Sequence, residues 1–276
     1  MPIRTTSQPA VAVEADWLAV GVFDQEDQVP DALATREAGA VVGRLRASKE
    51  VTGAVGETVA VLGGTGLKAD ALLLFGLGLR TTFGAGAAYQ AGVAIARKLA
   101  GKARGRVAVV VPAEATADEV AHLVCGLEVG QRGPDLRKAE PARRPFGELV
   151  MVTHAGPSGT LEAAVHQGTI LGEAVNLARE LVNTPPAEKP PARLAARARE
   201  VAEAAGFHAE VWGEERLRQE RFGGLLGVAA GSDQPPAFVI LDYRHGGDAP
   251  ALALVGKGVT FDSGGLSLKP HDSMAD

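Results

Sequence analysis

Residues 71–111, ALLLFGLGLRTTFGAGAAYQAGVAIARKLAGKARGRVAVVV, decide the fold of this chain. The stretch begins and ends with largely apolar runs, 71–77 and 106–111, that are too short for an ordinary helix. Between them, residues 84–99 are rich in alanine and end in two basic residues, which interact favourably with the negative end of a helix dipole. A strand, a helix and a second strand in this order predict a parallel or mixed sheet covered by helices.

The same alternation of apolar runs and helical stretches extends over the first half of the chain. Strands are predicted at residues 17–23, 57–62, 71–77, 106–111 and 148–153, and helices at residues 31–46, 84–99 and 117–129. Residues 130–145 (GQRGPDLRKAEPARRP) combine proline, glycine and charge and predict a surface loop. The strand at 148–153 is expected to complete this first, mixed sheet.

A long helical pattern separates the first half from a second α/β unit. The pattern covers residues 159–182 and stops at Asn183-Thr184-Pro185-Pro186, because a double proline does not continue a helix. Beyond it, helices are predicted at 191–205 and 214–220, and strands at 209–212, 237–243 and 251–255. We therefore expect an α/β protein with an N-terminal α/β accessory domain at 1–157, a linker helix at 158–183 and a second α/β unit at 184–276.

Composition and charge exclude several classes of protein. The 276 residues are 46% hydrophobic and 22% charged, which is typical of a globular chain and not of a disordered one. The formal net charge of −5 argues against nucleic acid as a partner, since a nucleic-acid binder needs a basic surface. There is no N-terminal signal pattern and no apolar run of about 18 residues, so we expect a cytoplasmic protein without a membrane partner. The single cysteine, Cys125, excludes a multi-cysteine zinc site.

Several features that look like functional motifs are better explained by structure. Gly63-Gly64-Thr65-Gly66 and Gly76-Leu77-Gly78 fit neither the dinucleotide-binding pattern nor the P-loop, so we interpret them as tight turns. Cys125 lies among apolar residues of a predicted helix, which favours a buried small side chain over a nucleophile. The six histidines are scattered singly and form no H-x-x-x-H or H-E-x-x-H pair.

The stretch 256–270, GKGVTFDSGGLSLKP, differs from these because it places charged residues among glycines after an apolar run. If residues 251–255 (ALALV) form a strand, Lys257 and Asp262 lie just past its carboxyl end, where open α/β sheets bind ligands. The flanking glycines allow close backbone approach and positive φ. From the residues alone two interpretations stay open: a ligand site, or a turn capped by Asp262 with solvated lysines.

This stretch resembles the signature of the leucine aminopeptidase family, the dinuclear-metal cytosol aminopeptidases. The family pattern reads Gly-Lys-Gly, then Thr-Phe-Asp-Ser-Gly-Gly, then Ser-hydrophobic-Lys, and residues 256–269 match it without a break. Asn183-Thr184-Pro185-Pro186 resembles the start of the family's catalytic domain, and residues 222–243 (FGGLLGVAAGSDQPPAFVILDY) resemble the segment before its metal strand. The first half is similar in pattern to the family's variable α/β domain. The resemblance therefore implies that residues 184–276 begin an α/β metallopeptidase catalytic domain.

The resemblance also implies roles for three residues. Lys257 would be an amine ligand of one metal and Asp262 would bridge two metals. Lys269 would stay protonated and polarise the scissile carbonyl or stabilise its oxyanion. Two divalent metal ions, Mn or Zn, would activate a bridging water and bind the α-amine of the substrate. The implied function is the release of N-terminal, preferably apolar, leucine-like residues from peptides by a homohexamer.

The chain departs from the family pattern in the remaining metal ligands. In the family, a third aspartate ligand follows a Met-x-x-Met-Lys region that begins here near Met274. Further ligands lie in an Asn-Thr-Asp-Ala-Glu-Gly-Arg motif that these residues do not contain. Asp272 and Asp276 do not align with the missing ligand, so we expect a fragment that ends inside the catalytic domain and is inactive alone. The alternative is a non-catalytic binding module, with residues 1–157 binding a nucleotide, ADP-ribose or DNA.

Overall fold

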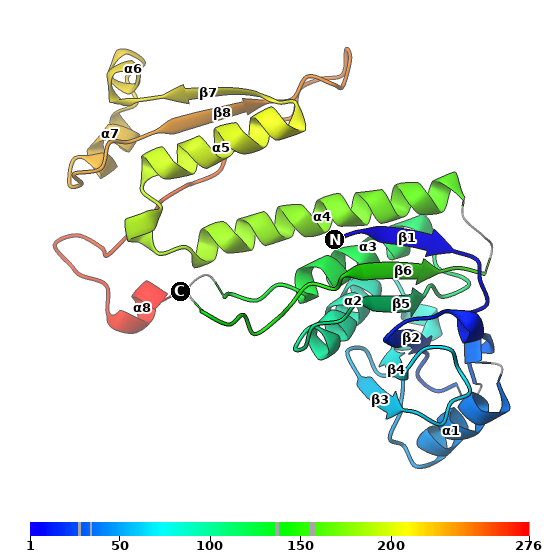
Figure 1. Ribbon diagram of the computed structural model, residues 1–276. Coiled ribbons are helices and arrows are strands. Elements are labelled where there is room, and N and C mark those ends of the chain that lie inside the picture. The colour runs from blue at the N-terminus through cyan, green and yellow to red at the C-terminus, as the bar shows by residue number, and fades with distance from the viewer. Residues whose placement is uncertain (27–28, 34, 136–137, 155–157, 276) are drawn as a thin grey trace. The chain divides into compact units, whose positions relative to one another are not determined.

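The computed structural model describes residues 1–276 except 27–28, 34, 136–137, 155–157 and 276, and it leaves the side chains of residues 274–275 undescribed. Two compact units follow one another along the chain, Met1–Glu180 and Leu181–Asp276 (Figure 1). The division into an accessory domain, a linker helix and the beginning of a catalytic domain stays a prediction. In the described part of the chain, no helix is both long and apolar enough to cross a membrane.

The first unit is built on a six-stranded mixed sheet, which confirms the predicted fold class (Figure 1). The strand order across the sheet is β1 (Ile3–Thr6), β6 (Glu148–Val152), β5 (Arg106–Val110), β2 (Trp17–Val22), β4 (Ala71–Gly76) and β3 (Thr58–Leu62). Neighbouring strands are parallel except for β3, which runs antiparallel to β4. Trp17 lies opposite both Ala71 and Val107, so the three central strands begin at the same edge.

The sheet does not end at the strand predicted for residues 148–153. β6 lies between β5 and β1, and Ile3 of β1 pairs with Leu149. The sequence of β1, Ile-Arg-Thr-Thr, is short and mostly polar, so it contains no apolar run from which a strand is predicted. An edge strand pairs on one side only and does not need the continuous apolar run of the central strands.

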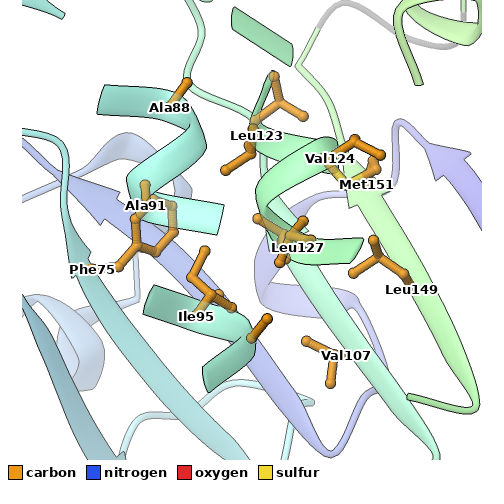
Figure 2. Packing of buried hydrophobic residues seen from close by; sticks show 14 of the residues in the cluster. Phe75, Ala88, Ala91, Ile95, Val107, Leu123, Val124, Leu127, Leu149 and Met151 are labelled. Carbon is orange, nitrogen blue, oxygen red and sulfur yellow. The ribbon is translucent and has the colours of Figure 1, made fainter. Parts of the chain in front are cut away.

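Helices cover both faces of this sheet. The long helices of the described part of the unit are α1 (Arg36–Ala47), α2 (Ala85–Leu99), α3 (Ala117–Gly130) and α4 (Gly159–Asn183). Successive strand residues point to opposite faces. Leu73 and Phe75 of β4 therefore join the core beneath α2 and α3 (Figure 2), whereas Leu72 and Leu74 join the core beneath α1. The result is a sheet between two helical layers.

α2 and α3 cross at very close range because each presents glycine to the other. A Cβ atom on Gly92 of α2 would clash with the carbonyl oxygen of Leu123, and one on Gly126 of α3 would clash with that of Tyr89. Ala96 of α2 lies at the same contact, because a Cβ atom on Gly130 of α3 would lie 2.6 Å from the Ala96 Cβ. Ala91 lies beside Phe75 of the sheet (Figure 2). The packing of the two helices therefore requires glycine at positions 92 and 126.

Local capping decides where the helices begin. In α3, the Thr116 hydroxyl accepts a hydrogen bond from the Glu119 N–H at 3.3 Å, and the Glu119 carboxylate accepts one from the Thr116 N–H at 2.7 Å. In α1, the Thr35 hydroxyl accepts a hydrogen bond from the Ala38 N–H at 3.1 Å. This helix therefore begins at Arg36 and not at residue 31 as predicted, and Asp31–Leu33 forms a separate 3-10 turn.

The second unit contains a two-stranded antiparallel sheet and several helices. Its elements are the 3-10 turn Pro186–Glu188, α5 (Pro191–Ala205), β7 (His208–Trp212), α6 (Glu214–Gln219), α7 (Gly223–Ala229), β8 (Phe238–Asp242) and α8 (His271–Ala275). Helix α5 ends at Gly206, whose φ of 74° lies in the left-handed region that favours glycine. Trp212 pairs with Phe238 in the ladder, and the two rings pack with Phe222 at centroid distances of 5.0 to 5.5 Å.

The strand predicted for residues 251–255 is wrong. The structure has no strand there, and Leu252, Leu254 and Val255 are 85%, 88% and 97% exposed. A strand needs a neighbour for its backbone hydrogen bonds, and among the described residues of this unit β7 and β8 pair only with each other. The apolar pattern is present, but the described residues supply no strand that pairs with it.

Candidate active site

The glycine-rich stretch near the C-terminus folds back on itself in a tight loop. The Lys269 N–H donates a hydrogen bond to the Ser263 carbonyl oxygen at 2.9 Å and closes the loop. Gly264 has a φ of 95°, which favours glycine, and a Cβ atom there would lie 2.5 Å from the Ser267 carbonyl oxygen. The loop therefore requires glycine at this position, and its closure brings Lys269 back to Asp262.

Asp262 and Lys269 form an ion pair across this loop. The Lys269 Nζ donates a hydrogen bond to Asp262 Oδ2 at 2.8 Å, and the Gly264 N–H donates one to Oδ1 at 2.9 Å. The Lys269 hydrogen bond is the largest cause that holds the pKa of Asp262 below its ordinary value, followed by the Gly264 N–H, with a smaller effect from the charge of Lys257. The carboxylate is therefore ionised at neutral pH. The Asp262 and Lys269 side chains are 46% and 38% exposed, so a ligand can reach both.

Two of the three predicted site residues are thus in contact. Lys257 forms no hydrogen bond or ion pair with any residue that the structure describes, although its charge acts on Asp262. Asp262 caps a turn through Gly264, as the second interpretation expects, and it also pairs with Lys269, which that interpretation does not include. The ligand-site interpretation stays a prediction. The Gly264 N–H is not among the predicted site groups, although an aspartate two residues before a glycine often accepts a hydrogen bond from its own turn. The metal-binding and catalytic roles of these residues stay predictions.

The donors of this loop do not make a metal centre by themselves. Among the residues that the structure describes, no group of three or more His, Cys, Asp or Glu side chains is placed to hold a metal ion. Asp262 is the one carboxylate between residues 256 and 270. Asp272 lies in α8, and Asp276 lies outside the described residues. Because a metal centre usually has three or four protein ligands, these residues supply at most part of one.

The carboxyl ends of β2, β4 and β5 are the other place where this type of sheet binds ligands. Here Arg80 donates hydrogen bonds to Glu26 at 2.6 and 2.9 Å and to Glu114 at 2.6 Å. Its guanidinium also lies 4.0 Å from the centroid of the Phe23 ring. The hydrogen bonds from Arg80 hold the pKa of Glu26 below its ordinary value. An ion-pair network therefore occupies the edge at which a nucleotide would bind.

Two models of one protein family match this chain and together cover most of it. The model described as the N-terminal domain of the cytosol aminopeptidase family matches residues 19–131, and the one described as its catalytic domain matches residues 176–276. The chain belongs to the cytosol aminopeptidase family. The resemblance based on GKGVTFDSGGLSLK is thereby confirmed.

Curated relatives from this family align with almost the whole chain. A probable cytosol aminopeptidase of Syntrophotalea carbinolica is 37% identical over 286 residues, which cover 99% of this chain and 57% of the relative. A probable cytosol aminopeptidase of Solibacter usitatus is 35% identical over 277 residues, which cover 99% of this chain and 55% of the relative. The chain thus spans little more than half the length of these cytosol aminopeptidases.

Solved structures share the fold. The bottromycin maturation enzyme BotP in complex with Mn has a TM-score of 0.72 and 30% identity, over 94% of this chain and 51% of its own. A mutant of tomato leucine aminopeptidase has a TM-score of 0.80 and 22% identity, over 95% of this chain and 55% of its own. The second likeness concerns the fold alone, and the first covers residues of both units of this chain.

Proposed function

We propose that this chain is part of a metal-dependent aminopeptidase that releases N-terminal, leucine-like residues from peptides. The observation that carries the proposal is the ion pair of Asp262 and Lys269, which sets a carboxylate 2.8 Å from an ammonium group inside the family signature. Membership of the cytosol aminopeptidase family supports the reaction class. The Mn in the related BotP structure supports a divalent metal.

Lys257 and Asp262 are proposed as metal ligands. Asp262 is ionised and accessible at neutral pH, as a carboxylate ligand must be. The Lys257 amine would bind a metal only after losing its proton, so metal and proton would compete for it. Two divalent ions, Mn or Zn, when bound lower the pKa of a water molecule and thereby supply a nucleophile. The described residues hold only part of the ligand set, so the other ligands would have to lie elsewhere in the whole protein.

Lys269 is proposed as the catalytic residue. Asp262 Oδ2 accepts a hydrogen bond from one of the three N–H groups of the ammonium, which leaves two donors for a substrate. A positive charge next to the peptide carbonyl either polarises it or stabilises the negative charge that develops on its oxygen when water attacks. Without a metal ion on Oδ2, Asp262 orients this ammonium group.

The proposal includes a cytoplasmic homohexamer for the whole protein, on the strength of the family resemblance, and an inactive 276-residue chain. One carboxylate and one amine cannot hold two divalent ions in a closed site. The alternative of a nucleotide, ADP-ribose or DNA site at the edge of the first sheet has less support, because Arg80 with Glu26 and Glu114 occupies that edge.

Substitution of Lys269 tests the proposal. The host is a chimera in which residues 1–276 are followed by the remaining part of the catalytic domain of the Syntrophotalea carbinolica relative. With Mn²⁺ present, Lys269→Met is expected to lower kcat for hydrolysis of a leucine anilide by about a hundredfold or more, as the loss of one donor to a developing oxyanion does. Bound Mn²⁺, measured by atomic absorption, should stay unchanged.

Lys102→Met, at an exposed lysine of the first unit, serves as the matched control and should leave kcat unchanged. An unchanged kcat in Lys269→Met would contradict the catalytic role of Lys269. Loss of Mn²⁺ together with activity in this variant would assign Lys269 to metal binding or to the fold of the loop.

A further inference from the structure

A groove of about 630 Å³ runs along one side of α2 in the first unit. Pockets of this size hold small molecules. The α2 residues that line it form two rows with helical spacing: Tyr89, Val93 and Arg97 in one, and Gln90, Ala94 and Lys98 in the other. Gly56 and Thr58 at the start of β3, and Val129 and Arg179 at the ends of α3 and α4, complete the lining.

The groove is aromatic at one end and cationic at the other. Arg97 comes eight positions after Tyr89 in the helix, so the two residues lie about 12 Å apart along the helix axis. None of the described residues that line the groove is acidic. Glu57 lies next to two lining residues in the sequence, but its carboxylate accepts hydrogen bonds from the Thr52 and Gly53 N–H groups at 3.0 and 2.7 Å. Its negative charge is therefore engaged outside the groove.

The cations at the far end have no acidic partners in the part of the chain that the structure describes. Among the described residues, neither Arg97 nor Lys98 forms an ion pair. Arg179 is held by neutral groups, since it donates hydrogen bonds to the carbonyl oxygens of Val129 and Arg132 at 3.1 and 3.2 Å. The fold thus fixes one guanidinium beside two unpaired cations.

Arg143 adds a further positive charge near these cations. It donates hydrogen bonds to the carbonyl oxygens of Gly130 and Arg132 at the end of α3. Burial lowers the pKa of Arg143, and the nearby charges of Arg97 and Arg179 lower it further, with only Asp135 opposing. A bound anion would relieve the repulsion among these groups.

We propose that this groove binds a phosphorylated small molecule with a planar ring, of the nucleoside diphosphate class. The phosphates would contact Arg97 and Lys98 through charge-assisted hydrogen bonds, and the ring would pack against Tyr89. The aromatic and cationic ends lie about 12 Å apart along the helix, so the ring and the phosphates would occupy opposite ends of the groove. The site lies in a different unit from Asp262 and does not depend on the peptidase proposal.

Basic residues at the end of a helix are also favoured by the helix dipole alone, so the test needs a control for this effect. α1 provides one, because Arg44 occupies its last turn, is exposed and does not line this groove. Arg44→Gln removes the same charge as Arg97→Gln from the corresponding place in another helix. Ala94→Phe fills the groove without changing its charge.

Isothermal titration calorimetry of the 276-residue chain with ADP, pyrophosphate and adenosine is the experiment. ADP is expected to bind more tightly than pyrophosphate, and adenosine to bind most weakly. The double substitution Arg97→Gln and Lys98→Gln is expected to raise the Kd for ADP by about tenfold or more, because it removes charge-assisted hydrogen bonds to the phosphates. Ala94→Phe should weaken ADP binding as well, and Arg44→Gln should leave it unchanged.

Two results would overturn the proposal. One is a failed ADP titration, which means either no binding at millimolar concentration or binding with a Kd that neither the double variant nor Ala94→Phe changes. The other is salt-dependent binding of a duplex oligonucleotide without binding of ADP, which would assign the cations to a nucleic-acid surface.

Discussion

At the residue scale, Asp262 uses both carboxylate oxygens inside its own loop. Oδ1 accepts a hydrogen bond from the Gly264 N–H, and Oδ2 accepts one from Lys269. A metal ion at Asp262 would have to replace or share the Lys269 contact, so ligation and the ion pair compete for one oxygen. Ion pairs exposed to water are weakly held, and the carboxylate therefore remains available to a stronger partner.

Glu128 is an acidic residue that is buried in the first unit. It lies in α3, is 3% exposed, and its Oε1 has no hydrogen-bond partner among the described residues. Burial is the largest effect and raises its pKa; the charges of the N-terminal amino group and Arg132 oppose this, and the charge of Glu173 adds a still smaller upward effect. Because its pKa is higher in the folded than in the unfolded state, stability falls as pH rises from the ordinary value of 4.5 through the folded-state pKa.

Glu128→Gln is therefore expected to increase the free energy of unfolding relative to wild type at pH 8 and to leave it nearly unchanged at pH 4. The substitution keeps the size of the side chain and removes its ability to ionise. Urea unfolding followed by circular dichroism between pH 4 and 8 measures the difference. Glu162→Gln, at an exposed position of α4, should show no such pH dependence. A difference for Glu128→Gln that is the same at every pH would contradict the account.

At the element scale, the crossing of α2 and α3 tests the packing of the first unit. Gly126→Ala places a methyl group against the Tyr89 carbonyl oxygen and is expected to destabilise the unit by about 1–3 kcal/mol, as overpacking does. Gly43→Ala in α1 meets nothing within 4 Å and should stabilise the unit by up to about 1 kcal/mol through helix propensity. Thermal unfolding distinguishes the two, and equal effects of both substitutions would refute the close crossing.

The elements that the sequence predicted well are those with a continuous apolar run or a long helical pattern. β2, β4, β5 and β6 lie within two residues of the predicted bounds, because central strands of a covered sheet are apolar on both faces. β1 and α7 were missed, since the first is a mostly polar edge strand and the second is a short, glycine-rich turn of helix. The strand prediction at 251–255 is wrong. A strand also needs a neighbouring strand to pair with, and the sequence of the run itself does not reveal whether one is present.

The candidate site was likewise predictable from the sequence only in part. The motif identified Lys257, Asp262 and Lys269 as residues of interest, because its spacing of glycines and charges is specific. The contact of Asp262 with Lys269 was not predictable from that spacing, since it depends on the positive φ of Gly264 and the closure of the loop at Ser263. Backbone conformation, and not residue type, decides which of the three side chains meet.

At the scale of the whole molecule, the two units differ in how well they bury their apolar residues. The first unit has cores on both faces of its sheet, whereas Tyr243, Leu252, Leu254 and Phe261 of the second unit are 61%, 85%, 88% and 63% exposed. Chymotrypsin, which cleaves after such residues, is therefore expected to cut first between residues 243 and 261 and to leave residues 1–180 intact. Mass spectrometry of a short digest identifies the cuts, and early cleavage within β2 to β6 would contradict this expectation.

The most direct test of the proposed enzyme is the rate at which leucine is released from a leucine anilide with Mn²⁺ or Zn²⁺ present. The account predicts no release by the 276-residue chain alone and metal-dependent release by the chimera with the remaining catalytic domain of the Syntrophotalea carbinolica relative. Asp262→Asn should abolish that release together with metal binding. Robust metal-dependent release by the 276-residue chain, or full activity of the Asp262→Asn chimera, would contradict it.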